Sequence, residues 1–384
     1  MAMECMTTPS PSLEEYKADN GALGGSTEFK AESVTPENFI WPDEFKAQDS
    51  LPELHVPHID IKKLLSGDEG GAEEAMRLVD EACRKHGFFV VVNHGVDMGI
   101  MKDLHKCMDE FFELPLDQKQ KAHRKLGDSY GYTSSYIGRF SDKLPWKETF
   151  SVCYLSHKDH SSLVHDYVRD TLGQEFSHHG KVYQECCKAM AELSLEVVEL
   201  LGMSLGLGRE EFKKLYEDHD SIMRLNYYPT CENPELTLGT GPHCDPTSIT
   251  ILHQDHVSGL QVHVDDQWYS IPPTPDSFVV NIGDTFMALT NGVYKSCFHR
   301  AVVNCKEVRK SVAFFLCPGA EKLVRAPEQL VEKNPPRKFP DFTWPMLHEL
   351  TQKFYRADSN TLKAFTTWLQ QQKLGAASTN NDNN

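Results

Sequence analysis

Three residues of this sequence have the types and the spacing to bind a metal ion. His243 and Asp245 are separated by one residue, in a segment that we expect to be a strand. Because successive side chains of a strand point to opposite faces, His243 and Asp245 share one face, while Cys244 turns away to pack. His299 belongs to a later segment with strand character. Two histidines and one carboxylate form the set that holds non-haem Fe(II) and leaves positions open for a co-substrate and dioxygen.

A second set of polar residues could hold a dicarboxylic co-substrate beside the metal. Arg309 and Ser311 alternate onto one face of a predicted strand, and Asn226 and Tyr228 do so upstream. A guanidinium fork with a neighbouring hydroxyl suits a carboxylate that accepts two hydrogen bonds. Taken singly, each of the four is more often a solvated strand residue. Together with the metal ligands, they offer chelation at one end of a keto acid and a cationic clamp at the other.

These motifs resemble those of the plant 2-oxoglutarate- and Fe(II)-dependent dioxygenases, over about residues 56–320. The motifs that carry the resemblance are Asn226-Tyr227-Tyr228-Pro229, His243-x-Asp245, His299 and Arg309-x-Ser311. Three further stretches are similar to the gibberellin 20-oxidases: Phe39-Ile40-Trp41-Pro42, Leu144-Pro145-Trp146-Lys147-Glu148-Thr149 and residues 236–255. No ligand or clamp position departs from the family pattern.

The resemblance implies a fold and a reaction. The fold would be α+β, a double-stranded β-helix (jelly roll) core with flanking helices. The reaction would be the stepwise oxidation of the C-20 carbon of C20 gibberellin precursors, which are diterpenoid carboxylic acids, to C19 gibberellins. Rival interpretations are another plant dioxygenase, such as a gibberellin 3-oxidase or a flavonoid oxidase, and a jelly-roll protein with a structural metal. A structural metal site needs no clamp, so Arg309-x-Ser311 disfavours the last.

The resemblance also implies the cofactors and their ligands. The co-substrates would be 2-oxoglutarate and dioxygen, with ascorbate as a candidate reductant. Asn226 is expected near the keto-acid end of 2-oxoglutarate, and Tyr228, Arg309 and Ser311 at its distal carboxylate. The expected iron ligands are His243, Asp245 and His299. Three histidines compete with His299 for the third position, and the family interval to the clamp disfavours them: His253, His256 and His263.

The residues that meet the substrate are less defined by the sequence. A gibberellin is a carboxylic acid and the chain is acidic overall, so we expect a local cation in the pocket. Lys147 and Arg139 are the candidates, and a solvated charge is the alternative for each. Trp146 would either line the pocket against an apolar skeleton or only anchor its loop. We predict that Lys147 or Arg139 holds the substrate carboxylate, and Arg224 is the next basic residue to test if neither does.

Composition narrows the class of protein. The chain has 384 residues, 40% of them hydrophobic, which is enough for a sizeable core. Its net charge of −17 argues against a nucleic-acid partner. The sequence has no apolar run long enough to span a membrane and no secretory signal. The 11 scattered cysteines are typical of reduced thiols, so we expect a cytoplasmic protein. The oligomeric state is left open.

The pattern along the chain predicts five segments: a mobile N-terminal arm (1–50), a helical and mixed region (51–215), a jelly-roll catalytic core (216–320), C-terminal helices (321–375) and a disordered tail (376–384). Helices are expected over 71–86, 98–114, 174–205, 344–357 and 361–373. The core should contain many short strands, with residues 286–290 among them, and Asn291-Gly292 should form a hairpin turn. His94 is expected in a turn, hydrogen-bonded to the backbone.

Overall fold

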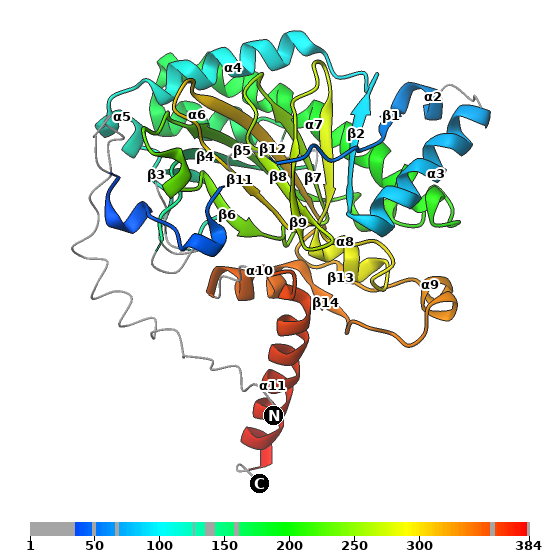
Figure 1. Ribbon diagram of the computed structural model, residues 1–384. Coiled ribbons are helices and arrows are strands. Elements are labelled where there is room, and N and C mark those ends of the chain that lie inside the picture. Colours follow the sequence, from blue (N-terminus) through cyan, green and yellow to red (C-terminus); the bar gives the residue numbers. More distant parts are fainter. Residues whose placement is uncertain are drawn as a thin grey trace.

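Two β-sheets lie face to face and helices cover the larger one (Figure 1). The computed structural model describes residues 35–47, 51–65, 69–125, 127–134, 143–156, 161–353 and 358–381. The N-terminal arm up to residue 34 and Arg139 lie outside these described residues. Within the described ranges, no helix combines the length and the apolar character needed to cross a bilayer.

The larger sheet has eight strands, which neighbour one another in the order β1-β2-β10-β7-β12-β5-β4-β3. In that order their bounds are His58–Asp60, Phe88–Val92, Phe278–Ile282, Ile249–Gln254, Arg309–Cys317, Asp220–Tyr228, Glu148–Leu155 and Gly131–Ser134. The smaller sheet has the order β6-β11-β8-β9, with bounds Thr240–His243, His299–Ala301, Leu260–Val264 and Gln267–Ile271. Apart from the β1–β2 pair, the paired strands in both sheets are antiparallel. This is the jelly-roll core that the sequence predicts.

Strand β2 shows how the two faces of the larger sheet are used. Its sequence is an unbroken apolar run, Phe88–Val92. Phe88 and Val90 point between the two sheets, where they pack with residues of β8 and β10. Phe89 and Val91 point the other way, into the main core beneath the helices. An apolar run without alternation is therefore explained by burial on both faces.

The helices that cover the outer face of the larger sheet begin with α2 (Ile61–Leu65) and α3 (Glu69–Lys85). The others are α4 (Met98–Phe112), α5 (Leu116–Gln120), α6 (Leu163–Leu172) and α7 (Ser177–Ser204). The helix predicted over residues 174–205 is confirmed as α7, and its apolar residues, such as Met190, Val197 and Leu200, are fully buried. Helix α4 begins where the Asp97 side chain accepts a hydrogen bond from the Gly99 amide at 2.7 Å.

Three predictions about local structure were wrong in type or extent. Residues 286–289 belong to a helix, α8 (Asp284–Leu289), and Thr290 is its C-cap, because a short buried apolar run does not distinguish helix from strand. Asn291 and Gly292 do turn, with φ of 52° and 75°, but they follow that helix and join no hairpin. The last helix, α11 (Thr361–Asn381), was expected to end at Lys373 with a disordered tail from residue 376, yet it continues to Asn381. Alanines at 376 and 377 favour that continuation.

The remaining elements complete the lower part of Figure 1. They are β13 (Leu323–Val324), α9 (Glu328–Lys333), β14 (Phe342–Thr343) and α10 (Trp344–Lys353).

The prediction for His94 is confirmed. Its Nδ1 accepts from the Val96 amide at 3.1 Å, and its Nε2 lies 3.2 Å from the Asp276 carbonyl.

Candidate active site

The predicted metal ligands meet where strand β6 ends and strand β11 begins. His299 of β11 is the direct cross-strand partner of His243 of β6, and their ring centroids lie 4.3 Å apart. Asp245 follows β6 on the face that the strand alternation predicts. One ligand atom from each of the three residues lies within 4.8 Å of the others. Two adjacent strands therefore place three donor atoms around one point.

Backbone carbonyls fix which nitrogen of each histidine is available. Nδ1 of His243 lies 2.8 Å from the Gly241 carbonyl, and Nδ1 of His299 lies 3.1 Å from the Cys297 carbonyl. A carbonyl oxygen only accepts, so each Nδ1 carries the proton and each Nε2 keeps its lone pair. Those Nε2 atoms lie 3.4 and 3.9 Å from the carboxylate oxygens of Asp245. The lone pairs and the carboxylate thus converge.

Asp245 is held in one orientation by neighbours on the larger sheet. Its Oδ2 accepts hydrogen bonds from Thr250 Oγ1 at 2.6 Å and from Asn281 Nδ2 at 3.0 Å. Burial alone would raise the pKa of this carboxyl, but His299, His243 and Thr250 outweigh it and hold the pKa well below its usual range. Asp245 is therefore an ionised, oriented ligand.

The four predicted clamp residues lie side by side on β5 and β12. Arg309 pairs with Tyr228 and Ser311 with Asn226 in the register of these antiparallel strands. Asn226 Nδ2 donates to Ser311 Oγ at 3.3 Å, and the Arg309 guanidinium lies over the Tyr228 ring at 5.0 Å. Since all four line the pocket that holds the metal cluster, the two predicted sets form one site.

Arg309 is a buried guanidinium with two unused hydrogen-bond donors. It is 1% exposed, and its Nη2 donates to Gln254 Oε1 at 2.8 Å. Its Nε and Nη1 are buried and make no hydrogen bond to any described residue. Buried donors without partners are unfavourable, so these two suit a carboxylate ligand. This is the observation by which the site fits 2-oxoglutarate.

The competing histidines have other partners. His253 makes a ring-to-ring hydrogen bond with His105 at 2.9 Å, and exposed His256 pairs with Glu307 at 2.9 Å. His263 packs against the Trp268 ring, with centroids 5.0 Å apart. Cys244 is buried, and burial raises the pKa of its thiol well above the ordinary value, in line with packing. None of these four joins the metal-ligand cluster formed by the described residues.

Some residues of the hexapeptide motif anchor the chain around it, and Lys147 lines the pocket. Glu148 is buried and accepts from Lys119 at 2.6 Å and from Tyr132 at 2.5 Å, which ties β4 to its surroundings. Lys147 lines the pocket and donates to Thr240 Oγ1 at 2.9 Å. Trp146 is absent from the described pocket lining; it packs edge-on against Phe39, with centroids 5.1 Å apart. Of the two alternatives for Trp146, the geometry favours the loop anchor over the pocket wall.

Further arginines line the pocket in addition to Lys147 and Arg309. Arg124 and Arg224 both line it, and each donates to Ser151 Oγ at 3.0 Å. Arg224, already a candidate from the sequence, shares its strand face with Asn226 by the alternation along β5. Arg124 was not a candidate, because it lies in a loop where no such alternation could have indicated it.

The fold and the donor set define a class of protein. A profile of the 2OG-Fe(II) oxygenase superfamily matches residues 219–318, and one described as non-haem dioxygenase in morphine synthesis N-terminal matches residues 56–171. The chain belongs to the 2OG-Fe(II) oxygenases.

Gibberellin 20 oxidase 2 of Arabidopsis thaliana is 55% identical over 377 residues, which cover 96% of this chain and 98% of the relative. Gibberellin 20 oxidase 1-A of Triticum aestivum is 56% identical, with coverages of 89% and 94%. Within the class, the chain belongs to the gibberellin 20-oxidase family.

Solved structures support the fold and the wider dioxygenase class. A crystal structure of JOX2 in complex with 2OG, Fe and JA superposes with a TM-score of 0.75 at 29% identity, covering 88% of this chain and 95% of JOX2. The rice dioxygenase for auxin oxidation superposes with a TM-score of 0.67 at 28% identity, with coverages of 80% and 99%.

Proposed function

We propose that this protein is a gibberellin 20-oxidase that oxidises the C-20 carbon of C20 gibberellin precursors in successive steps and forms C19 gibberellins. One observation carries the proposal: the cluster of His243, Asp245 and His299 shares a pocket with the buried guanidinium of Arg309 and its two unused donors. The curated relatives support the substrate class, since gibberellin 20 oxidases of three plants are 50–58% identical to this chain.

The roles of the chain's residues follow from their positions. When bound, Fe(II), 2-oxoglutarate and dioxygen supply the oxidation, with 2-oxoglutarate decarboxylated to succinate. His243, Asp245 and His299 would hold the iron through two imidazole nitrogens and one carboxylate oxygen, a set that suits Fe(II).

The clamp residues would orient the co-substrate. Arg309 and Ser311 would donate to the distal carboxylate of 2-oxoglutarate, and Tyr228 would complete that end of the cleft. Asn226 would lie toward the keto-acid end. The apolar packing between the sheets, around Phe88 and Val262, closes the sandwich beside the site and excludes water.

Repeated oxidation of one carbon requires a substrate that stays aimed while the polarity of that carbon changes. An anchor on the substrate carboxylate would achieve this, because positioning then does not depend on the reacting group.

Lys147 and Arg139 were the predicted anchors. Lys147 is bonded to Thr240, on the strand that ends in His243. Arg224 lies two residues from Asn226, about 7 Å along the strand. Its side chain and that of Arg124 donate hydrogen bonds to the same Ser151 hydroxyl, so two cations lie together in the pocket. Among the described residues, we therefore propose Arg224 as the first anchor candidate.

Replacing the anchor should alter both affinity and product ratio. We expect Arg224→Ala to raise the gibberellin KM by about tenfold or more, the value of a hydrogen bond to a charged group. More alcohol and aldehyde intermediate should appear per C19 product. The measurement is a time course of the three products from a C20 precursor, with Lys147→Ala and Arg139→Ala run in parallel. A product ratio and KM unchanged in Arg224→Ala would remove Arg224 from this role, and the parallel variants would show whether Lys147 or Arg139 holds it.

The reaction itself is tested by coupling. Succinate release should be strongly stimulated by C20 gibberellin precursors and only weakly by flavonoids or by C19 gibberellins. Mass spectrometry of the products should show C-20 alcohol, C-20 aldehyde and C19 product in that order. Stimulation by a flavonoid or by a C19 gibberellin instead would favour the rival dioxygenases, and metal binding without any succinate release would favour a structural metal.

We also propose a cytoplasmic location. Ten cysteines of the described residues carry free thiols, and most of these are buried. Unpaired thiols in this number are typical of a reducing compartment. A fluorescent fusion that localised to a secretory compartment would contradict this location.

A further inference from the structure

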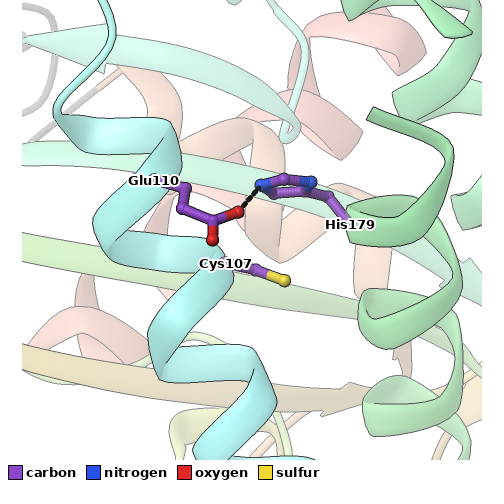
Figure 2. Close-up of side chains that lie close together, drawn as sticks. All are labelled: Cys107, Glu110 and His179. Carbon is purple, nitrogen blue, oxygen red and sulfur yellow. Dashed lines mark ion pairs between the residues drawn. The ribbon is translucent and has the colours of Figure 1, made fainter. Parts of the chain in front are cut away.

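A thiol, a carboxylate and an imidazole meet in the helical layer, on residues that the iron site does not use. Figure 2 shows Cys107 and Glu110 on α4 pointing toward His179 on α7. Cys107 and Glu110 are three residues apart, so they share one face of α4. His179 lies in the first turn of α7, the helix that packs against α4. One ligand atom from each residue lies within 4.8 Å of the others.

The geometry is close to that of a bound zinc ion. Zn²⁺ binds sulfur at about 2.3 Å and nitrogen or oxygen at about 2.0–2.1 Å, which sets tetrahedral ligand atoms about 3.3–3.7 Å apart. Nε2 of His179 already lies 3.1 Å from Glu110 Oε2. From a separation of at most 4.8 Å, the sulfur needs to approach by at most about 1.2 Å. That distance is on the scale of a change in side-chain torsion.

His179 is a buried ring with one polar partner in the described part of the chain, Glu110. It is 8% exposed, between the rings of Phe176 and Tyr183. Nδ1 makes no hydrogen bond with any described residue, and Nε2 has the contact with Glu110 at 3.1 Å. A buried polar ring with so few partners is unfavourable, so a metal ion bound to it would offset that free-energy cost.

Access and selectivity both follow from the three side chains. Cys107 is 2% exposed, whereas the Glu110 side chain is 47% exposed, so an ion can enter from the solvent side. Exposed Lys106 lies 3.9 Å from Glu110 and can turn away into solvent. A thiolate and an imidazole are poor ligands for Mg²⁺ and Ca²⁺, which prefer oxygen, and good ligands for Zn²⁺.

We propose that Cys107, Glu110 and His179 form a zinc site that links α4 to α7, with water in the fourth position. The thiol proton of Cys107 leaves to solvent when the Zn–S bond forms. Because the ligands come from two helices, bound zinc stabilises their packing and raises the unfolding temperature by mass action. The site uses no residue of the iron centre, so this proposal stands independently of the proposed function.

Cobalt distinguishes the two sites in the full chain. Co²⁺ bound to a thiolate gives a near-ultraviolet sulfur-to-metal charge-transfer band, and Co²⁺ on His243, Asp245 and His299 has no thiolate to give one. We expect titration with Co²⁺ to produce this band in the wild type, and added Zn²⁺ to bleach it. Cys107→Ser should abolish the band, and Glu110→Gln, at an exposed position, should weaken it without disturbing the fold. The zinc-induced rise in Tm should be lost in Cys107→Ser.

Cys305→Ser is the matched control, because Cys305 is an exposed thiol outside the cluster. It should leave both the band and the Tm response intact. Absence of the band in the wild type, its persistence in Cys107→Ser, or its loss in Cys305→Ser would each overturn the proposal. Should Cys107→Ser fail to fold, Glu110→Gln decides: an unchanged cobalt affinity in that variant also overturns it.

Discussion

Alanine at any one of His243, Asp245 or His299 should lower turnover by at least about a thousandfold, or about 4 kcal/mol of activation barrier. Each substitution takes one donor from a set of three, and no other described His, Cys, Asp or Glu lies in that cluster to replace it. The histidine variants should keep the fold, since both rings line the pocket, with side chains 12% exposed, and do not belong to an apolar core cluster. The measurement is the initial rate at saturating iron and 2-oxoglutarate, with thermal unfolding to confirm the fold.

The matched control is His263→Ala. His263 lies on β8, the neighbour of β11, and packs against Trp268 outside the metal cluster. Its loss should leave turnover within a few-fold of the wild type. Near-normal activity in His243→Ala, Asp245→Ala or His299→Ala would show that the iron ligands are assigned wrongly.

Strand alternation explains why so much of the candidate site could be predicted. The side-chain period of a strand is two, so Asn226 and Tyr228, or Arg309 and Ser311, share a face whatever the strand pairs with. The register then places Arg309 opposite Tyr228. The same alternation places Arg224, the third candidate for the substrate carboxylate, on that face of β5.

Other parts of the site depend on contacts between distant segments. Gln254, the hydrogen-bond partner of Arg309, comes from β7, and its proximity follows from the β7–β12 pairing. Arg124 reaches Ser151 because its loop is held by β3 and β4. The cluster of Cys107, Glu110 and His179 depends on how α4 crosses α7. Long-range packing of this kind leaves no mark in local periodicity.

Helix α8 shows the limit of periodicity at short range. Residues 286–289 are apolar and Thr290 is β-branched, with turn residues on either side, which is typical of a buried strand. In the structure Phe286 and Leu289 are both buried, at the spacing of one helical turn. Five residues contain too few repeats to distinguish helical spacing from strand spacing. The packing of the surrounding chain therefore determines that this segment is a helix.

Arg309→Lys should raise the KM for 2-oxoglutarate by about tenfold or more, while the gibberellin KM changes little. Lysine keeps the positive charge but loses the planar fork, so it cannot donate two parallel hydrogen bonds to a carboxylate. It also loses the bond from Nη2 to Gln254 and leaves a buried amide oxygen without its donor.

The control is Lys310→Ala: Lys310 alternates to the other face of β12, where it pairs with Asp109 at 2.6 Å. That variant removes a neighbouring cation and should leave the 2-oxoglutarate KM unchanged. Steady-state kinetics with each substrate varied in turn would test this, and an equal rise in both KM values for Arg309→Lys would place Arg309 outside the co-substrate cleft.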